Sequence, residues 1–340
     1  MKNLLILGLV FSGVSAAASP FQDSSDIFYQ KGLEEKSAKR YMVASKHFDK
    51  AISINPKFTQ AYLENGYVNL EMRRSEIAKV NFTKVTELDP ANIQAMKELV
   101  QLFYSHHQYQ KAIDLALKCK ACGNNDRIIA LSYYHLEDYG NAEKGLVAVL
   151  AKDPSDALAA YTLGRTYMEM ELEAKAIAWY QKAVEIDPSK AGWAQELGLL
   201  FFNAGNFKNA VIYFNKAAEN GFTQSNDFKE NLGFAHFYSR DFEKGEKILG
   251  EVLAKKPGNK DILRDLAQGF YDYKMYDKSL EYCQRLMEMD MKDGQALYQA
   301  GLCFQKKGQK EKGQAMCDKA IELDPSLNNL RKQQMLAAGL

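Results

Sequence analysis

Six prolines divide the chain at nearly regular intervals, and this spacing restricts the fold more than any other feature. Consecutive members of the set are 34, 64, 34, 69 and 68 residues apart, which is close to one, two, one, two and two lengths of 34 residues; they are Pro56, Pro90, Pro154, Pro188, Pro257 and Pro325. Proline inside a helix costs about 3 kcal/mol and pushes the preceding residue out of helical geometry. Each proline therefore predicts the end of a helix.

Small residues recur in phase with the prolines. When each repeat is cut so that its proline is residue 32, repeats begin at residues 25, 59, 93, 123, 157, 191, 226, 260 and 294. The twentieth residue is then always Ala, Gly or Ser, and the eighth is Gly or Ala everywhere except at Val100. Glycine in a helix costs about 1 kcal/mol relative to alanine, so we infer that close approach of two helices compensates. Both halves of each repeat show the periodicity of an amphipathic helix, which predicts a helical hairpin.

The repeat AYTLGRTY…AKAIAWYQKAVEIDP resembles the tetratricopeptide repeat, whose period is 34 residues. Its matching residues are Leu163, Gly164, Tyr167, Ala176, Tyr180, Ala183 and Pro188. The resemblance covers Ser25 to Pro325 and implies an all-α fold, an α-solenoid in which stacked helix-turn-helix repeats form a right-handed superhelix. Nine repeats are expected, at residues 25–58, 59–92, 93–122, 123–156, 157–190, 191–225, 226–259, 260–293 and 294–325, followed by a capping helix at 326–340. The repeat at 93–122 is four residues short and lacks its proline.

The first twenty residues, MKNLLILGLVFSGVSAAASP, are typical of a secretory signal peptide. The apolar run from Leu4 to Val14 is too short to span a bilayer. We expect a signal peptide at 1–18, cleaved after Ala16 or Ala18, and a linker at 19–24. The mature protein is then exported, periplasmic or secreted, with no membrane insertion after cleavage.

Composition argues against several classes of function. The formal charge of +1 includes Lys2 of the signal peptide, so the mature chain carries about zero net charge and no binding of nucleic acid is indicated. The sequence contains no complete phosphate-binding loop, no Gly-x-Ser-x-Gly and no His-Glu-x-x-His. We therefore expect no enzymatic activity, no cofactor and no metal site.

The resemblance implies that the first helix of each repeat lines the concave side of the superhelix. Residues two, five, nine and twelve of a repeat lie along one stripe of that helix. The stripe contains aromatic residues, Met and Arg, which are enriched in protein-binding hot spots. The candidate binding residues are Tyr67, Tyr104, Arg127, Tyr134, Tyr161, Arg165, Met168, Phe202, Glu230, Phe234, Phe237, Arg264, Tyr271 and Tyr298. For each of them the alternative is packing against the neighbouring repeat.

These residues predict a non-enzymatic scaffold that binds a partner protein or peptide in its concave groove. Some members of the family hold a peptide carboxylate with paired Lys and Asn on this face. Here Lys97 is followed by Gln101, and the next repeat has no matching pair, so that clamp is not predicted. The identity of the partner is left open, and a monomer is favoured over a self-associating structural protein.

Cys119 and Cys122 have the spacing of a dithiol redox motif, so a thiol redox factor is the rival function. They also occupy the twenty-seventh and thirtieth residues of their repeat, where other repeats carry apolar core residues. A free cysteine is more often a small buried hydrophobe than a reagent. Their spacing is thus explained by the core, and a disulfide between them would stiffen the one repeat that lacks its proline.

Overall fold

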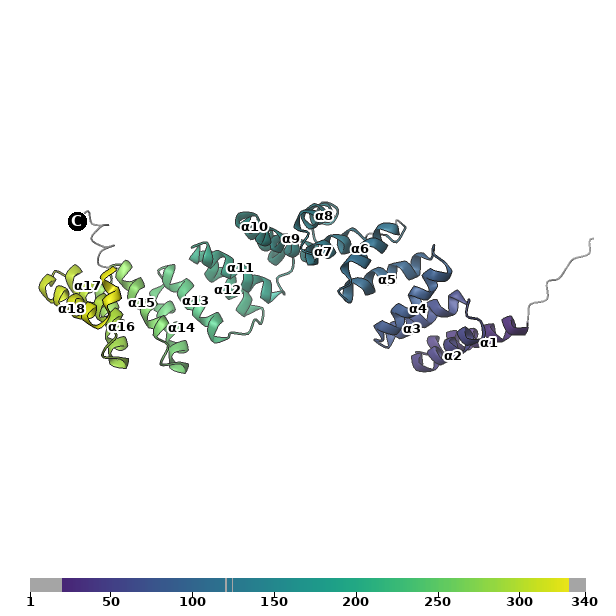
Figure 1. Cartoon of the computed structure of the whole chain (residues 1–340), viewed down its shortest axis with the longest axis horizontal. Helices are drawn as coiled ribbons and strands as arrows, with labels where there is room; N and C mark the ends of the chain where they lie inside the picture. The colour runs from purple at the N-terminus through teal and green to yellow at the C-terminus, as the bar shows by residue number, and fades with distance from the viewer. Residues whose placement is uncertain (1–19, 120, 124, 330–340) are drawn as a thin grey trace, which may run out of the picture. The chain divides into compact units, whose positions relative to one another are not determined.

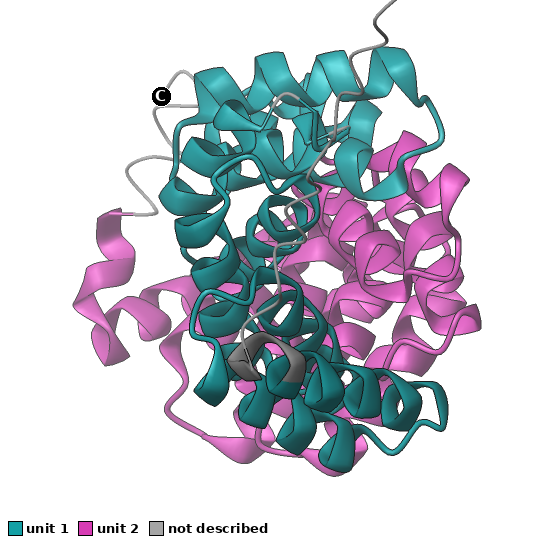
Figure 2. Cartoon of the chain, turned by 90° about the vertical axis from the view of Figure 1, so that its right-hand side faces the viewer, with its two compact units in different colours: residues 1–179 teal, residues 180–340 magenta. Residues whose placement is uncertain are grey.

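The computed structural model describes residues 20–119, 121–123 and 125–329, and of residues 20–23 only the backbone. The signal peptide predicted at 1–18 and most of the capping helix predicted at 326–340 lie outside this part of the chain. Within it, all regular secondary structure is helical, which confirms the all-α prediction (Figure 1). The chain divides into two compact units, residues 1–179 (unit 1) and 180–340 (unit 2), coloured separately in Figure 2.

In unit 1 the helices are α1 (Pro20–Ser37), α2 (Tyr41–Ile54), α3 (Thr59–Glu71), α4 (Ser75–Leu88), α5 (Ile93–Ser105), α6 (Tyr109–Lys118), α7 (Asp126–His135), α8 (Tyr139–Lys152) and α9 (Ala157–Glu169). Helix α10 (Glu173–Ile186) contains the boundary between the units. Unit 2 continues with α11 (Ala191–Asn203), α12 (Phe207–Glu219), α13 (Asn226–Tyr238), α14 (Phe242–Lys255), α15 (Lys260–Asp272), α16 (Tyr276–Met289), α17 (Gly294–Lys306), α18 (Lys310–Leu323) and the 3-10 turn η1 (Pro325–Leu327).

Helices α1–α8 and α11–α18 pack in pairs as hairpins, and successive hairpins pack on one another within each unit, as a solenoid requires. Seven first helices begin at the first residue of a predicted repeat, at residues 59, 93, 157, 191, 226, 260 and 294. Two differ. Helix α1 begins at Pro20, so residues 20–24, expected to be a linker, are helical, and α7 begins at Asp126, three residues after the predicted start at Gly123. The right-handedness of the superhelix stays a prediction.

The prolines end the second helix of a hairpin as predicted. Each of the six lies two residues beyond the last residue of α2, α4, α8, α10, α14 or α18. In several of these turns the residue before the proline accepts a hydrogen bond from the backbone N–H two residues later, as Asp153 does from Ser155 at 3.0 Å. Proline fixes its own backbone angle while the Asp side chain replaces a lost helical hydrogen bond.

The turn inside each hairpin has one recurring conformation. The fifteenth residue of every repeat has positive φ, and it is not glycine at Lys39, Arg73, His107, Glu137, Glu171, Arg240 and Lys274. The residue after it donates a hydrogen bond to the carbonyl five residues earlier, as Gln108 does to Phe103 at 2.8 Å. This is a Schellman ending, which turns the chain into the second helix in a fixed direction.

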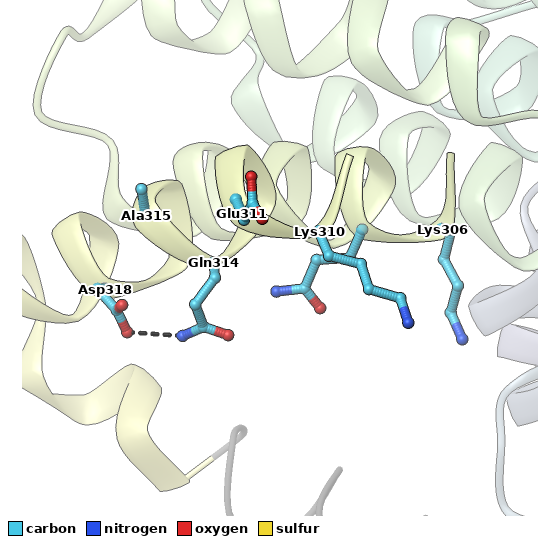
Figure 3. A pocket seen from close by; sticks show the side chains of 7 residues that line it. Lys306, Lys310, Glu311, Gln314, Ala315 and Asp318 are labelled. Atoms are coloured by element: carbon cyan, nitrogen blue, oxygen red, sulfur yellow. Dashed lines mark hydrogen bonds between the residues drawn. The ribbon is translucent and has the colours of Figure 1, made fainter. Parts of the chain in front are cut away.

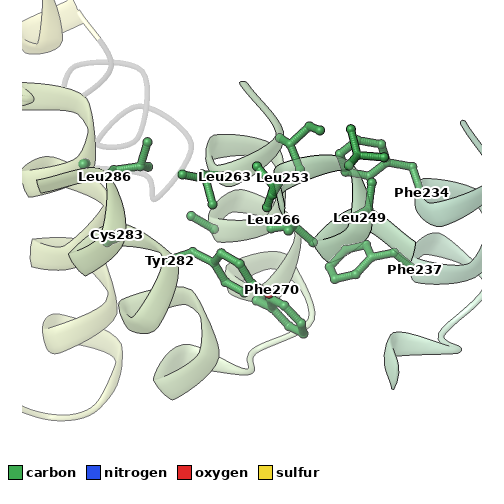
Figure 4. Close-up of a cluster of buried hydrophobic side chains, with 14 of the residues drawn as sticks. Phe234, Phe237, Leu249, Leu253, Leu263, Leu266, Phe270, Tyr282, Cys283 and Leu286 are labelled. Atoms are coloured by element: carbon green, nitrogen blue, oxygen red, sulfur yellow. The ribbon is translucent and has the colours of Figure 1, made fainter. Parts of the chain in front are cut away.

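The small-residue positions bring the two helices together. A Cβ atom placed on Gly66 would lie 2.6 Å from the ring of Phe82, and one on Gly198 would lie 2.7 Å from the ring of Phe214. The close approach inferred from the sequence is thus present, and in these hairpins a phenylalanine ring fills the space beside the glycine. In unit 2 aromatic rings also join one hairpin to the next. The rings of Phe237 on α13 and Phe270 on α15 lie 4.8 Å apart in an edge-to-face pair (Figure 4).

A disulfide joins Cys119 and Cys122 in the irregular joint between α6 and α7. Helix α6 ends at Lys118, and Cys122 donates its backbone N–H to the carbonyl of Cys119 at 3.0 Å. Both cysteines are 5% exposed, as expected for core positions. The other three cysteines, Cys283, Cys303 and Cys317, are buried and form no disulfide. In the part of the chain that the structure describes, no helix combines the length and apolar character that crossing a bilayer needs.

Candidate functional site

The fourteen candidate binding residues all lie on the first helices of hairpins. In unit 1 they are on α3 (Tyr67), α5 (Tyr104), α7 (Arg127, Tyr134) and α9 (Tyr161, Arg165, Met168). In unit 2 they are on α11 (Phe202), α13 (Glu230, Phe234, Phe237), α15 (Arg264, Tyr271) and α17 (Tyr298). The stripe was predicted as one surface, but the structure supports a separate description for each unit.

Three of these residues belong to the core, and their assignment to a binding surface is wrong. The exposed fraction is 0% for Phe237, 4% for Tyr298 and 6% for Phe234. Phe237 packs edge-to-face on Phe270 of the following hairpin. Tyr298 packs in a cluster with Cys317 and Ala320 of α18 and Leu327 of η1. Bulky apolar side chains of the stripe are therefore covered by whichever helix or turn follows them.

The sequence analysis missed a further set of contacts that the candidate aromatic residues make inside their own hairpins. Five candidate aromatics pack on the aromatic residue that starts the second helix of the same hairpin, five residues later. The ring centres are between 5.3 and 6.1 Å apart in the pairs Tyr104–Tyr109, Tyr134–Tyr139, Phe202–Phe207, Phe237–Phe242 and Tyr271–Tyr276. The spacing of the pair is visible in the sequence and marks the hairpin turn. One face of each of these rings is therefore used to close the turn.

In unit 1 the stripe builds a continuous surface that we call the aromatic–arginine surface, formed by Tyr104, Tyr109, Tyr134, His135, Tyr161 and Arg165. Its centre is the exposed side chain of Arg165 on α9. The guanidinium carbon lies 5.5 Å from the ring centre of Tyr134 on α7 and 6.0 Å from that of Tyr161, one turn earlier on α9. Arginine stacked on aromatic rings is held in position by them.

His135 extends this surface towards α5 and α6. Its ring stacks on that of Tyr109, with 4.6 Å between centres and 8° between planes. Its Nε2 lies 3.4 Å from the hydroxyl of Tyr104. His135 was not among the residues predicted from the sequence, because no nucleophile stands near it in the chain.

The charges on this surface come from arginine and not from histidine. Partial burial against the neighbouring rings lowers the pKa of His135, and the positive charges of His107 and Arg165 lower it further. Burial also raises the pKa of the Tyr104 hydroxyl, with a smaller contribution from Tyr109. At neutral pH the imidazole of His135 is therefore neutral and the Tyr104 hydroxyl protonated, beside the stacked guanidinium of Arg165.

Two candidate arginines have a structural role. Arg127 Nε lies 2.6 Å from a carboxylate oxygen of Asp156, and Asp156 caps α9 by accepting the N–H of Ala159 at 3.0 Å. In unit 2, Arg264 donates from Nη2 to Asp293 at 2.9 Å, and Asp293 caps α17. Both arginines thus connect one hairpin to the start of the next first helix.

The corresponding face of unit 2 is acidic. Burial raises the pKa of Glu230 on α13, and the carboxylates of Asp227 and Asp265 raise it further. Burial likewise raises the pKa of Asp265 on α15, with a contribution from Asp261. This face therefore differs in chemistry from the aromatic–arginine surface of unit 1.

A hollow on α17 and α18 is formed by the charged outer side of the last hairpin (Figure 3). It is lined by Gln305, Lys306, Lys310, Glu311, Gln314, Ala315 and Asp318. Gln314 donates to Asp318 one turn away at 2.8 Å. Six of its seven lining residues are polar or charged, so it has the character of a solvated helix face. Across the described residues, no three His, Cys, Asp or Glu side chains gather in the way that binds a metal ion.

Comparison with known proteins identifies the repeat. Models described as tetratricopeptide repeat match residues 129–191, 195–220 and 294–327. The chain therefore contains tetratricopeptide repeats, as the resemblance indicated. Repeats of this family generally bind proteins or peptides, and the fold is usually a non-enzymatic scaffold.

Curated relatives are distant and much longer. The human protein O-mannosyl-transferase TMTC3 is 24% identical over 265 residues, which is 66% of this chain and 29% of the relative. The superkiller protein 3 of Schizosaccharomyces pombe is 23% identical over 294 residues, which is 78% of this chain and 21% of the relative. The chain thus spans less than a third of the length of each.

Similar solved structures are tetratricopeptide repeat proteins. One is the C-terminal part of a repeat protein from Cytophaga hutchinsonii, 22% identical, with a TM-score of 0.44, covering 67% of this chain and 95% of that one. Another is YrrB, described as having an unusual peptide-binding site, 22% identical, with a TM-score of 0.39, covering 53% of this chain and 92% of that one.

Proposed function

We propose that this chain, which contains tetratricopeptide repeats, is a non-enzymatic scaffold that binds a segment of a partner protein on the aromatic–arginine surface of unit 1. The observation that carries the proposal is the exposed guanidinium of Arg165, stacked between the rings of Tyr134 and Tyr161. Arginine and tyrosine contribute strongly to binding when they are held rigidly, because little side-chain entropy is then lost.

The chemistry of the surface suggests the kind of segment that it binds. The rings of Tyr104, Tyr109 and His135 offer flat apolar faces, and the phenol hydroxyls offer hydrogen bonds at their edges. Arg165 favours a carboxylate or a backbone carbonyl beside them. An extended segment with an apolar or aromatic residue next to an acidic one satisfies both requirements.

Export is part of the proposal and rests on the first twenty residues alone. An apolar run followed by small residues favours a signal peptide, so the scaffold would act in the periplasm or outside the cell. A disulfide at Cys119–Cys122 is compatible with an oxidising compartment. N-terminal sequencing of the mature protein tests this point directly.

The thiol redox function is the weaker alternative. Both cysteines are 5% exposed, whereas exchange requires an accessible sulfur. We therefore assign the disulfide a role in the joint between α6 and α7. A thiol titration that finds a fast, reversible two-electron change at these two residues would contradict this assignment.

The groove assignment is tested by photocrosslinking. A photoreactive residue placed at Met168 on α9 should capture a partner from the native compartment, and the Tyr161→Ala/Arg165→Ala variant should lose that product. The matched control is Lys144→Ala/Val147→Ala, because both residues are exposed on α8 of the neighbouring hairpin. Equal capture by both double variants would contradict the proposal. A crosslink only between copies of this chain would indicate the self-associating alternative.

A further inference from the structure

Unit 2 contains a small cavity between α15, α16 and α17. Its volume is about 230 Å³, and its lining includes Arg264, Gln268, Cys283, Tyr298, Gln299 and Leu327. Pockets for drug-sized ligands are usually about 300–1,000 Å³, so this one suits a single side chain. It lies in the other unit from the aromatic–arginine surface, and the proposed function makes no use of it.

Two hydrogen-bond donors that line this cavity have no acceptor among the residues that the structure describes. They are Arg264 Nε and Gln299 Nε2, and both atoms are buried. Buried polar atoms in folded proteins are nearly always hydrogen-bonded, and each exception calls for an explanation. Arg264 is oriented by its Nη2 hydrogen bond of 2.9 Å to Asp293, whose side chain is only 4% exposed. The Asp293 contact therefore fixes the guanidinium of Arg264, and Gln299 Nε2 is a second buried donor in the same lining.

The charges around the cavity decide which acceptor fits. Asp293 and Asp261 both lie within 4.0 Å of the Arg264 guanidinium, and Asp265 lines the cavity. Lys260 lies 3.2 Å from Asp290 and 4.0 Å from Asp293, so its charge is shared between these two carboxylates. Because carboxylates already outnumber cations at this place, another carboxylate would be repelled. A neutral carbonyl oxygen can accept from both donors without that repulsion.

We propose that this cavity binds the side-chain amide of a glutamine or asparagine in a peptide segment. The amide oxygen accepts from Arg264 and Gln299, and the amide NH₂ is left for an acceptor at the acidic rim, where Asp265 lies. Leu286, Ala296 and Leu327 contact the aliphatic part of the side chain. The inference relies on the proposed function only in taking a peptide as the ligand.

The test uses three capped amino acids of nearly equal size as probes: the N-acetyl methylamides of glutamine, glutamate and leucine. They are titrated into the full chain, and the side-chain N–H signals of Arg264 and Gln299 are followed by NMR. The glutamine probe should bind saturably and shift both signals, and the other two should bind at least fivefold more weakly. The Arg264→Lys variant keeps the charge opposite Asp293 but lacks Nε, and Gln299→Met keeps the length but lacks the amide. Each should weaken the glutamine probe at least fivefold.

Controls separate this site from the rest of the chain. Gln314→Ala removes an amide from α18 outside the cavity and should change nothing, and circular dichroism melting checks that every variant is folded. The Tyr161→Ala/Arg165→Ala variant should also bind the probe normally, because those residues belong to unit 1. Tighter binding of the glutamate probe, equal binding of the leucine probe or no binding of any probe would overturn the inference, without affecting the proposed function of unit 1.

Discussion

Arg127 on α7 forms an ion pair with Asp156, the residue that caps α9, and Arg264 on α15 stands in the same relationship to Asp293, which caps α17. In both units the arginine is the fifth residue of its repeat and the aspartate is the last. One carboxylate thus starts a helix and connects it to the preceding hairpin. The relationship gives both arginines a structural role, and the prediction that they also line a binding groove stays untested.

The first prediction concerns the stability of these two connections. Asp156→Ala removes a helix cap and an ion pair whose arginine is 45% exposed, and should lower the free energy of unfolding by about 1–2 kcal/mol. Asp156→Asn keeps the cap and should cost less than about 1 kcal/mol, because solvent around Arg127 screens the lost charge pair. Asp293→Ala should cost more than Asp156→Ala, since the Asp293 side chain is 4% exposed against 10% for Asp156, and its removal leaves Arg264 with only the exposed Asp261. Urea unfolding of the three variants measures how much each one lowers the free energy of unfolding. An equal decrease for Asp156→Ala and Asp293→Ala would contradict the prediction.

A second prediction follows from the hairpin turns. Glu171 has φ of 58°, a conformation that costs a residue with a Cβ atom about 1–2 kcal/mol, whereas glycine adopts it freely. Glycine also has a larger conformational entropy in the unfolded chain, which offsets part of this gain. Glu171→Gly should therefore raise the free energy of unfolding by about 0.5–1 kcal/mol. The converse control is Gly205→Ala, at the same place in another repeat with φ of 70°, which should destabilise by about 1 kcal/mol. The shift in denaturation midpoint measures both, and a destabilising Glu171→Gly would show that the glutamate side chain has another role.

The third prediction is a pH dependence that originates at His135. Its pKa in the folded chain is below its usual value of about 6.5, chiefly because of partial burial, so the folded state favours the neutral ring. The stability that His135 contributes is complete above pH 6.5 and decreases as the pH falls below it, since the unfolded chain then binds the proton more readily. His135→Gln should make unfolding less sensitive to pH in this range. An NMR titration of the imidazole checks the cause directly, and a pKa above 6.5 would reverse the sign.

Much of the fold was predictable because it is repeated. A single proline or glycine is weak evidence, but the same residue at the same place in successive repeats sets the helix ends and the close contacts, as at Pro154 and Gly198.

The binding surface was predicted less well than the fold. Phe237 and Tyr134 both occupy the twelfth place of a repeat, yet one is fully buried and the other is half-buried against Arg165. That difference depends on which side chains the next hairpin places over them, and helix periodicity does not contain this information.

The fourth prediction concerns the disulfide in the joint before α7. Cys119 and Cys122 close a loop of only four residues, for which the chain-entropy model gives about 2 kcal/mol of stabilisation. Reduction should therefore lower the free energy of unfolding by about 2 kcal/mol or less. The Cys119→Ser/Cys122→Ser variant should be destabilised without reductant and unaffected by it. Because Cys283, Cys303 and Cys317 form no disulfide, they do not contribute to the difference between oxidised and reduced chains. If the double variant responds to reductant as the unaltered chain does, the effect comes from another cysteine and the assignment to this joint is wrong.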